Sequence, residues 1–243
     1  MFEENITGFL EEVDGSIPAD QIIVDAPLAG LSTYRVGGSA AALIKVEENS
    51  SFSAILKGLA KFPMPVMIMG TGSNVLISDN GFEGVVIKLG EFFETIEIED
   101  TVVKVGAAAK LPVVARETVK FGLSGFEWAV GVPGSIGGAV RMNAGGHGSD
   151  MAASLVEVTI LNLLNGAVSN IPASELQLSY RQSCIKSTDL VIDATLKLLP
   201  GDKDESSHLL KEIVKWRRDN QPGGQNSGSV FTNPEGDSAG RLI

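Results

Sequence analysis

The chain contains little cysteine and histidine: one cysteine, Cys184, and two histidines among 243 residues. A lone thiol cannot form a disulfide within the chain, and so few ligands provide no zinc-binding cluster. Neither His147 nor His208 has a spacing to Cys184 that supports a nucleophile and base pair. We therefore expect no metal site and no Cys/His catalytic centre.

Basic residues are also few. The 19 lysines and arginines are outnumbered by 30 aspartates and glutamates, which gives a net charge of -11. This balance argues against a nucleic-acid partner, although backbone N–H groups can still bind an anionic ligand. The acidic N-terminus lacks a signal-peptide pattern, and no run of about 18 apolar residues could cross a membrane. We expect a cytoplasmic protein without a membrane partner.

Glycine is abundant, and it is most concentrated in the segment from Gly125 to Gly148, GFEWAVGVPGSIGGAVRMNAGGHG. The segment is too apolar for a flexible surface linker, which is typically polar. Because glycine lacks a Cβ atom, it permits left-handed turns and close approach of another group to the backbone. We interpret the segment as a buried wrap around a flat or phosphorylated ligand. A set of tight turns between packed elements is the alternative.

Hydrophobic spacing predicts a first lobe of α/β type. An amphipathic helix is expected within residues 1–20, either packed on the outside or swinging free. The elements expected after it are a strand at 41–46, a helix at 49–61 and strands at 66–69 and 85–87. The lobe therefore closes near residue 89. Arg35, before the first of these strands, could meet an anion or form a surface ion pair, and the ion pair is favoured for an isolated arginine.

A Gly-x-Gly turn follows the strand at 66–69 directly, in the segment GTGSN at 70–74. Successive backbone N–H groups in such a turn can point into one concavity, and Ser and Asn add hydrogen-bond donors. The segment is not the six-position dinucleotide fingerprint, and no P-loop lysine follows it. These residues support a phosphate cradle and a hairpin turn equally.

The rest of the chain predicts a second lobe that is mostly β. The elements expected are a hairpin at 93–106, a helix at 112–121 and strands at 155–163, 166–171 and 190–198. An acidic linker at 201–206 and a helix at 207–218 then lead to a polar, glycine-rich tail. The fold class expected from this order is α+β.

Five segments, in this order, resemble the UDP-N-acetylenolpyruvoylglucosamine reductase family. They are TYRVGGSA (33–40), GTGSNVLISDNGFEGVVIKL (70–89), GVPGSIGGAVRMNAG (131–145), YRQS (180–183) and RRDNQPGGQNSGSVFTNP (217–234). Each segment alone is a weak signal, but five in the right order are specific. The resemblance extends from about residue 28 to the last residue.

The resemblance implies a two-lobed FAD-binding domain of the vanillyl-alcohol-oxidase/PCMH type with an incomplete C-terminal α+β substrate domain. The implied divisions are a helical extension at 1–27, the FAD-binding domain at 28–200 with lobes at about 28–90 and 91–200, and the start of a substrate-binding domain at 201–243. Family members continue for several tens of residues and supply a late glutamate that no residue here matches. We therefore expect the chain to be truncated.

The resemblance also implies where FAD binds. The loop from Gly70 to Leu76 is similar to the family's pyrophosphate cradle, and the segment from Gly131 to Ala139 resembles the part that lies along the flavin. The implied cofactor-binding residues are Arg35, Gly70, Thr71, Gly72, Ser73, Asn74, Val75, Leu76, Gly131, Val132, Pro133, Gly134, Ser135, Gly137, Gly138, Ala139 and Asn143. Asn74 and Ile136 argue against covalent attachment, so we expect non-covalent FAD.

For the reaction, the resemblance implies that NADPH reduces the flavin and that UDP-N-acetylglucosamine enolpyruvate becomes UDP-N-acetylmuramate for peptidoglycan. Arg181, beside Tyr180, resembles the residue that polarises the substrate carboxylate, and Ser229 resembles the proton donor. Gln221 and Asn233 are further substrate-binding candidates. We expect a monomer. The alternatives are another FAD-dependent oxidoreductase of the same fold and a catalytically silent FAD-binding fragment.

Overall fold

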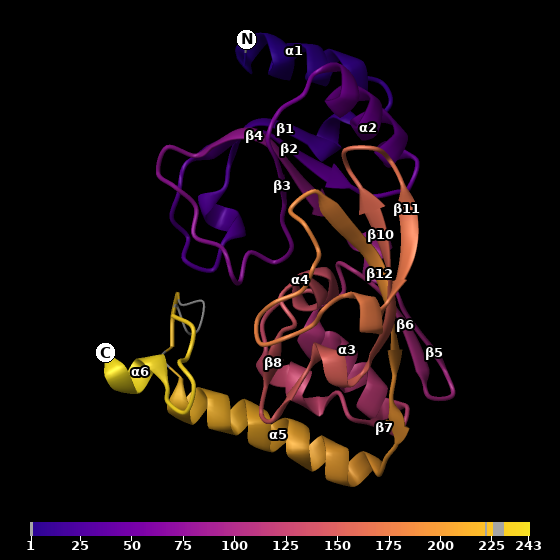
Figure 1. Cartoon of the computed structure of the whole chain (residues 1–243), viewed down its shortest axis with the longest axis vertical. Coiled ribbons are helices and arrows are strands. Elements are labelled where there is room, and N and C mark those ends of the chain that lie inside the picture. Colours follow the sequence, from indigo (N-terminus) through magenta and orange to yellow (C-terminus); the bar gives the residue numbers. More distant parts are fainter. Residues whose placement is uncertain (1, 222, 226–230) are drawn as a thin grey trace.

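The computed structural model describes residues 2–221, 223–225 and 231–243, which form two lobes. The first lobe carries both α1 and α2 and occupies the upper part of Figure 1. The second lobe lies below it, and α5 runs along the lower edge of the molecule. This arrangement of sheets with helices on their faces confirms the predicted α+β class.

The first sheet has the order β1-β2-β4-β3. Its strands are β1 (Ile22–Pro27), β2 (Ser39–Val46), β3 (Val66–Ile68) and β4 (Phe82–Leu89). Both β2 and β3 pair in parallel with β4, whereas β1 pairs antiparallel with β2. The crossover from β2 to β3 contains α2 (Ser51–Lys61), and residues 69–81 connect β3 to β4. Residues 22–27, expected in the N-terminal extension, therefore form an edge strand of this sheet.

The N-terminal helix α1 (Phe2–Val13) packs firmly on the first lobe and does not swing free. Phe9 and Val13 are fully buried, and a Cβ at Gly58 of α2 would lie 2.7 Å from the Phe9 ring. Glycine at that position thus lets the two helices approach closely. Together α1 and α2 cover the outer end of the first sheet (Figure 1).

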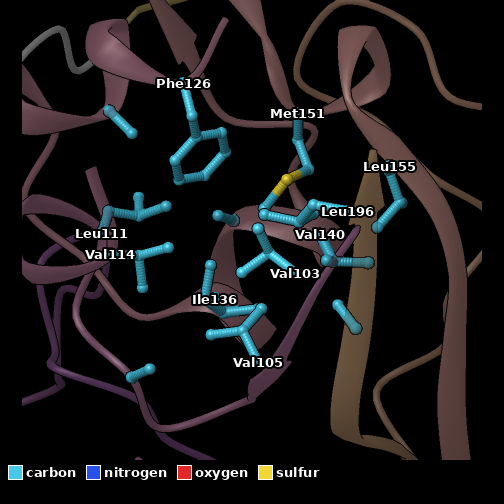
Figure 2. Close-up of a cluster of buried hydrophobic side chains, with 14 of the residues drawn as sticks. Val103, Val105, Leu111, Val114, Phe126, Ile136, Val140, Met151, Leu155 and Leu196 are labelled. Carbon is cyan, nitrogen blue, oxygen red and sulfur yellow. The ribbon is translucent and has the colours of Figure 1, made fainter. Parts of the chain in front are cut away.

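The second sheet is antiparallel throughout, with the order β11-β10-β12-β6-β5. Its strands are β5 (Ile96–Glu99), β6 (Val102–Gly106), β10 (Leu155–Asn162), β11 (Val168–Pro172) and β12 (Asp189–Lys197). One face of this sheet packs against α3 (Leu111–Lys120), η4 (Glu127–Gly131) and α4 (Ile136–Arg141). Figure 2 shows the resulting core, in which side chains of β6, α3 and α4 lie together.

Short elements complete the fold. They are η1 (Ala19–Gln21), η2 (Ala29–Leu31), η3 (Glu91–Phe93), η5 (Met151–Ala153), η6 (Ala173–Glu175), the pair β7 (Leu123–Ser124) and β13 (Leu199–Pro200), the pair β8 (Gly145–Gly146) and β9 (Ser149–Asp150), and α6 (Ala239–Leu242). The glycine-rich segment 125–148 therefore contains η4, α4 and β8. It is a folded part of the second lobe's core rather than a linker.

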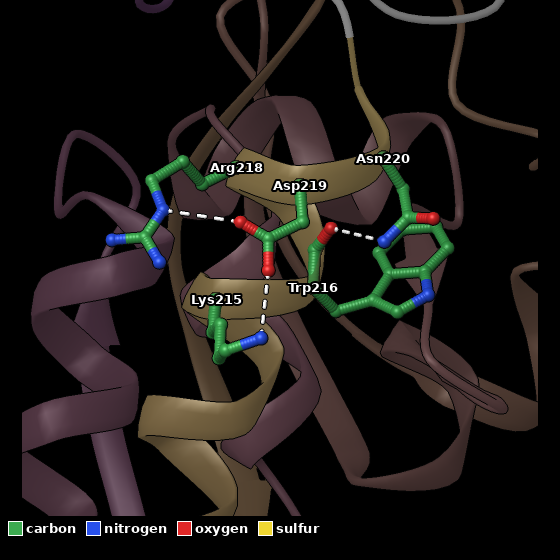
Figure 3. A network of polar contacts seen from close by, with 5 residues as sticks. All are labelled: Lys215, Trp216, Arg218, Asp219 and Asn220. Atoms are coloured by element: carbon green, nitrogen blue, oxygen red, sulfur yellow. Dashed lines mark hydrogen bonds and ion pairs between the residues drawn. The ribbon is translucent and has the colours of Figure 1, made fainter.

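The long helix α5 (Lys203–Asn220) begins earlier than predicted. The side chain of Asp202 accepts hydrogen bonds from the backbone N–H groups of Asp204 and Glu205, which caps the first turn. The predicted acidic linker at 201–206 is therefore wrong, because these acidic residues start a helix. In the last turn, Lys215 and Arg218 pair with Asp219 at 2.8 and 3.2 Å (Figure 3).

Candidate cofactor and substrate site

A cavity of about 550 Å³ lies between the two lobes. The first lobe contributes β3, the end of β4 and the start of the loop after β3, and the second lobe contributes residues 107–110, 135–138 and 186–191. The predicted cofactor-binding residues that line it are Gly70, Thr71, Ser135, Gly137 and Gly138. Two segments singled out in the sequence, about 60 residues apart, thus line one cavity.

The loop from Gly70 to Leu76 has free hydrogen-bond donors. Within the described residues, none of its backbone N–H groups donates to another protein group. The loop is no hairpin turn either, because the strands β3 and β4 that it helps to connect pair in parallel. Of the two readings left open by the sequence, these observations favour the phosphate cradle.

Glycine is required at the centre of this loop. Gly72 has a φ of +69°, and a Cβ there would lie 2.0 Å from the carbonyl oxygen of Leu31. Behind the loop, the backbone N–H of Thr33 donates to the carbonyl of Gly72 at 3.1 Å. The segment 33–38 therefore supports the loop from outside. Arg35 is exposed with a φ of 55° and makes no ion pair among the described residues.

The loop at 70–76 touches the second glycine-rich segment directly. Ser73 Oγ donates to the carbonyl of Pro133 at 2.9 Å. A Cβ at Gly70 would lie 2.5 Å from Ser135 Oγ, so the missing side chain allows the two segments to approach. The two segments, which the resemblance assigns to two parts of one cofactor, are thus in direct contact.

The segment from Gly134 to Gly137 is tied to the chain before α3. Gly134 accepts from the N–H of Leu111 at 3.0 Å, and the N–H groups of Ile136 and Gly137 donate to the carbonyls of Ala109 and Ala107, each at 2.9 Å. The N–H groups of Ile136 and Gly137 are therefore satisfied within the protein, whereas those of Gly134 and Ser135 donate to no protein group among the described residues. The bonds to the chain before α3 hold this segment in the cavity wall, and the first loop has no such bonds from its backbone N–H groups.

The other predicted cofactor-binding residues do not line the cavity, and Gly131 and Val132 are two of them. A Cβ at Gly131 would lie 2.8 Å from Ile213 of α5 and 2.9 Å from His147. The carbonyl of Gly131 also accepts a hydrogen bond from Arg217 of α5. Gly131 is thus required for close contact with α5, and its neighbour Val132 is likewise absent from the cavity wall.

Asn143 is almost fully buried and its side chain is engaged within the protein. Its Nδ2 donates to the carbonyl of Ser179 at 3.0 Å and to Asp150 Oδ2 at 3.1 Å. Its Oδ1 accepts from the N–H of Ala152 at 3.0 Å. Asn143 therefore fastens the Ser179 turn to η5. A contact of Asn143 with the cofactor stays a prediction.

Tyr180 and Arg181 occupy the tip of a tight turn. The backbones of Ser179 and Gln182 exchange hydrogen bonds of 3.0 and 3.1 Å, and Arg181 has a φ of 58°. The Arg181 guanidinium lies 5.2 Å from the centre of the Tyr180 ring and donates to the carbonyl of Gly145 at 2.9 Å. Both side chains are exposed, so the turn presents them to solvent and to ligands.

The structure describes two of the three substrate residues predicted in the C-terminal tail. Gln221 ends α5, where its N–H donates to Arg217 O at 2.9 Å, and its side chain is exposed. Asn233 Oδ1 accepts from the N–H of Ala239 at 2.9 Å, at the start of α6. Ser229 lies outside the described residues. Among the described residues, neither Gln221 nor Asn233 has a hydrogen bond to Arg181.

Lysines and one arginine concentrate around the cavity of an otherwise acidic protein. The charged residues that line it are Lys45, Lys88, Lys110, Arg141, Lys186, Glu91, Glu94 and Asp189. Lys88 was missed by sequence reasoning, although a lysine inside the apolar run GVVIKL is a signal that could have found it. Among the described residues there is no cluster of three or more potential metal ligands, and no helix is long and apolar enough to span a membrane.

Comparison with known proteins gives the family. Residues 40–171 match the FAD binding domain family. A UDP-N-acetylenolpyruvoylglucosamine reductase from Bacillus cereus is 37% identical over 236 residues, which cover 95% of this chain and 78% of that protein. The one from Paramagnetospirillum magneticum is 39% identical over 220 residues, covering 90% and 71%.

Solved structures agree with these sequences. The MurB enzyme of Thermus caldophilus, a UDP-N-acetylenolpyruvylglucosamine reductase, matches with a TM-score of 0.78 at 34% identity, covering 91% of this chain and 77% of that one. Phl p 4.0202, a glucose dehydrogenase, matches at a TM-score of 0.62 and 12% identity, a likeness of fold alone. The parallel strands, the interlobe cavity and this level of identity together lead to one conclusion: the chain belongs to the UDP-N-acetylenolpyruvoylglucosamine reductase family.

Proposed function

We propose that this protein binds FAD non-covalently and catalyses the NADPH-dependent reduction of UDP-N-acetylglucosamine enolpyruvate to UDP-N-acetylmuramate, a step of peptidoglycan synthesis. The names of its relatives support the reaction. The observation that carries the proposal is the interlobe cavity, which is lined by Gly70 and Thr71 at the start of the loop with open donors and by Ser135, Gly137 and Gly138 of the second glycine-rich segment. We further propose cytoplasmic localisation, a monomeric state and roles in cell-wall biogenesis, cell shape and cell division.

The residues present fit FAD. Free N–H groups in the loop from Gly70 to Leu76 suit a pyrophosphate, and Gly137 and Gly138 leave their part of the cavity wall without bulky side chains. When bound, FAD supplies hydride transfer from NADPH to the vinyl carbon of the substrate. The protein supplies the binding surface and its orientation. We propose residues 28–200 as the FAD-binding domain and 201–243 as the start of the substrate-binding domain.

Arg181 is proposed to bind the substrate carboxylate. Its guanidinium can make two parallel hydrogen bonds to a carboxylate and stabilise negative charge that develops beside it. The closed turn at 179–182 and the bond from Arg181 to Gly145 limit the positions that this side chain adopts. A fixed cation of this kind lowers the free energy of an enolate more than a mobile one does.

Ser229 is proposed to give the proton to the carbon next to the carboxylate. The proposal rests on the match of Gly228-Ser229-Val230-Phe231 to the family pattern. A serine hydroxyl is a weak acid, so it requires stabilisation of the alkoxide that forms. Tyr180, Gln221 and Asn233 are proposed as further substrate contacts.

Anaerobic half-reactions test this proposal. FAD-loaded protein should lose its yellow colour on addition of NADPH and regain it on addition of the enolpyruvyl substrate. Ser229→Ala should slow the second step by about 100-fold or more while leaving the first unchanged. Ser227→Ala in the same segment is the matched control. Unchanged reoxidation in Ser229→Ala would remove the proton-donor role, and bleaching without substrate-driven recovery would favour a silent FAD-binding protein.

A further inference from the structure

Lys88 places a half-buried ammonium group beside the loop at 70–76. It lies near the end of β4, a strand with neighbours on both sides, and its side chain lines the interlobe cavity. Its Nζ donates to the carbonyl of Gly70 at 2.6 Å, at the first residue of the loop. The cation is thus positioned where the first lobe meets the proposed pyrophosphate site.

The charge of Lys88 is poorly compensated within the protein. Burial, together with the positive charge of Lys110, lowers the pKa of Lys88, and Glu94 only partly opposes this effect. No carboxylate forms an ion pair with Lys88 among the described residues. A partly desolvated cation in this state is stabilised by any anion that enters the cavity.

Two neighbouring lysines, unlike Lys88, have carboxylate partners among the described residues. Lys45, on the adjacent strand β2, also lines the cavity but pairs with Glu47. Lys110 lies 3.9 Å from Glu94. Since these two cations have carboxylate partners, Lys88 is the lysine of this set that gains most from an anionic ligand.

We propose that Lys88 is the cation that pairs with the pyrophosphate of FAD, beside the first residue of the loop at 70–76. This inference rests on the proposed function, because it assigns a role within the same cofactor site. The backbone N–H groups at 70–76 supply hydrogen bonds, and Lys88 supplies the full positive charge that they lack. Its bond to Gly70 also couples the position of the cation to that of the loop.

Flavin fluorescence of the full chain, titrated with FAD, tests this pairing. Lys88→Met should weaken FAD binding by about 10- to 100-fold, the effect expected for one charge-assisted contact. Lys88→Gln separates charge from structure, because it keeps an N–H donor and should lose as much affinity as the Met variant. Lys88→Arg should retain most of the affinity. Lys45→Met is the matched control and should change the Kd by less than about threefold.

ADP serves as a second probe, because it carries the diphosphate without the flavin. Its affinity, measured by calorimetry, should fall in Lys88→Met and Lys88→Gln by a similar factor. Wild-type affinity in Lys88→Gln, or equal losses in the Lys45 and Lys88 variants, would overturn the role of Lys88 and leave the proposed function standing. A wild-type chain that binds neither FAD nor ADP would overturn both. Circular dichroism of each variant identifies losses that come from unfolding.

Discussion

The two glycine-rich segments of the cavity look alike in sequence but are built differently. From Gly70 to Leu76, the backbone N–H groups make no hydrogen bond among the described residues. In the segment 134–137, the N–H groups of Ile136 and Gly137 are bonded to the chain before α3. The first segment is therefore open to a ligand along its whole length, whereas the second is open only at Gly134 and Ser135 and is paired at Ile136 and Gly137.

This difference shows that glycine content alone does not identify a ligand-binding loop. Gly72 is needed for a left-handed turn against Leu31, whereas Gly131 is needed for close contact with α5. Both are packing requirements, and neither glycine lines the cavity. The criterion that separates the two segments is whether the backbone donors are already paired.

The largest effect is expected at the centre of the open loop. Gly72→Val would combine a φ of +69° with a Cβ that lies 2.0 Å from Leu31 O, so we expect a loss of roughly 3 kcal/mol or more in unfolding free energy. FAD binding should fail as well. Gly15→Val is the control, because Gly15 has a φ of +70° but nothing within 4 Å of its Cβ position. Equal denaturation curves for both variants would contradict the packing argument.

A smaller loss of stability is expected from a substitution at Asn143, which follows the second glycine-rich segment of the cavity. Asn143→Asp would lose both donated hydrogen bonds and place a second carboxylate beside Asp150, which should cost about 2 to 3 kcal/mol of stability. Because Ser179 would be released, reoxidation by the substrate should slow more than reduction by NADPH. Asp150→Asn retains an acceptor and is the control. If both half-reactions slowed equally, the turn would not depend on Asn143.

The contact between the two segments can be tested by two substitutions, the second of which removes the clash that the first creates. In Gly70→Ala the new Cβ would lie 2.5 Å from Ser135 Oγ, and we expect FAD binding to weaken by about tenfold. Removing the hydroxyl in Gly70→Ala/Ser135→Ala should restore much of the affinity. Fluorescence titration of the single and double variants measures this. Additive losses would show that the clash with Ser135 is not the cause.

The smallest effect is expected from removing the single hydrogen bond that joins the loop at 70–76 to the second glycine-rich segment. Ser73→Ala removes the donor to Pro133 O and should cost about 1 kcal/mol, or a fall of roughly 2 to 4 °C in Tm. Thr71→Val is the control, since Thr71 bonds only to Ser73 within the same loop. A fall in Tm for Thr71→Val as large as that for Ser73→Ala would indicate that the loop, rather than the contact between segments, sets this stability.

Much of the fold was predictable because it depends on local patterns. The helix predicted at 49–61 starts two residues before α2 and ends with it, the strand at 85–87 lies within β4, and Pro112 stands at the start of α3 as expected. The start of α5 was missed because the residues at 201–206 were read by charge alone. Asp202 acts as a cap, and acidic residues are favourable in the first turn of a helix.

The candidate site was predictable only in part. The motifs selected Gly70, Ser135 and Gly137, which the fold brings to one cavity. They did not select Lys88, because a lysine in a strand shows its burial and its missing partner only after the sheet and the second lobe are assembled. The motifs also could not show that the Asn143 side chain is already hydrogen-bonded to residues 150, 152 and 179.

The sequence by itself determined the elements and the family, since hydrophobic periodicity and ordered motifs are properties of the chain. It also limited the chemistry, because two histidines and one cysteine leave hydride transfer to a cofactor. Only the tertiary structure decided which backbone N–H groups of the two glycine-rich segments stay open and which are paired. The reason is physical: a backbone N–H is available to a ligand only if no distant part of the chain has already bonded to it.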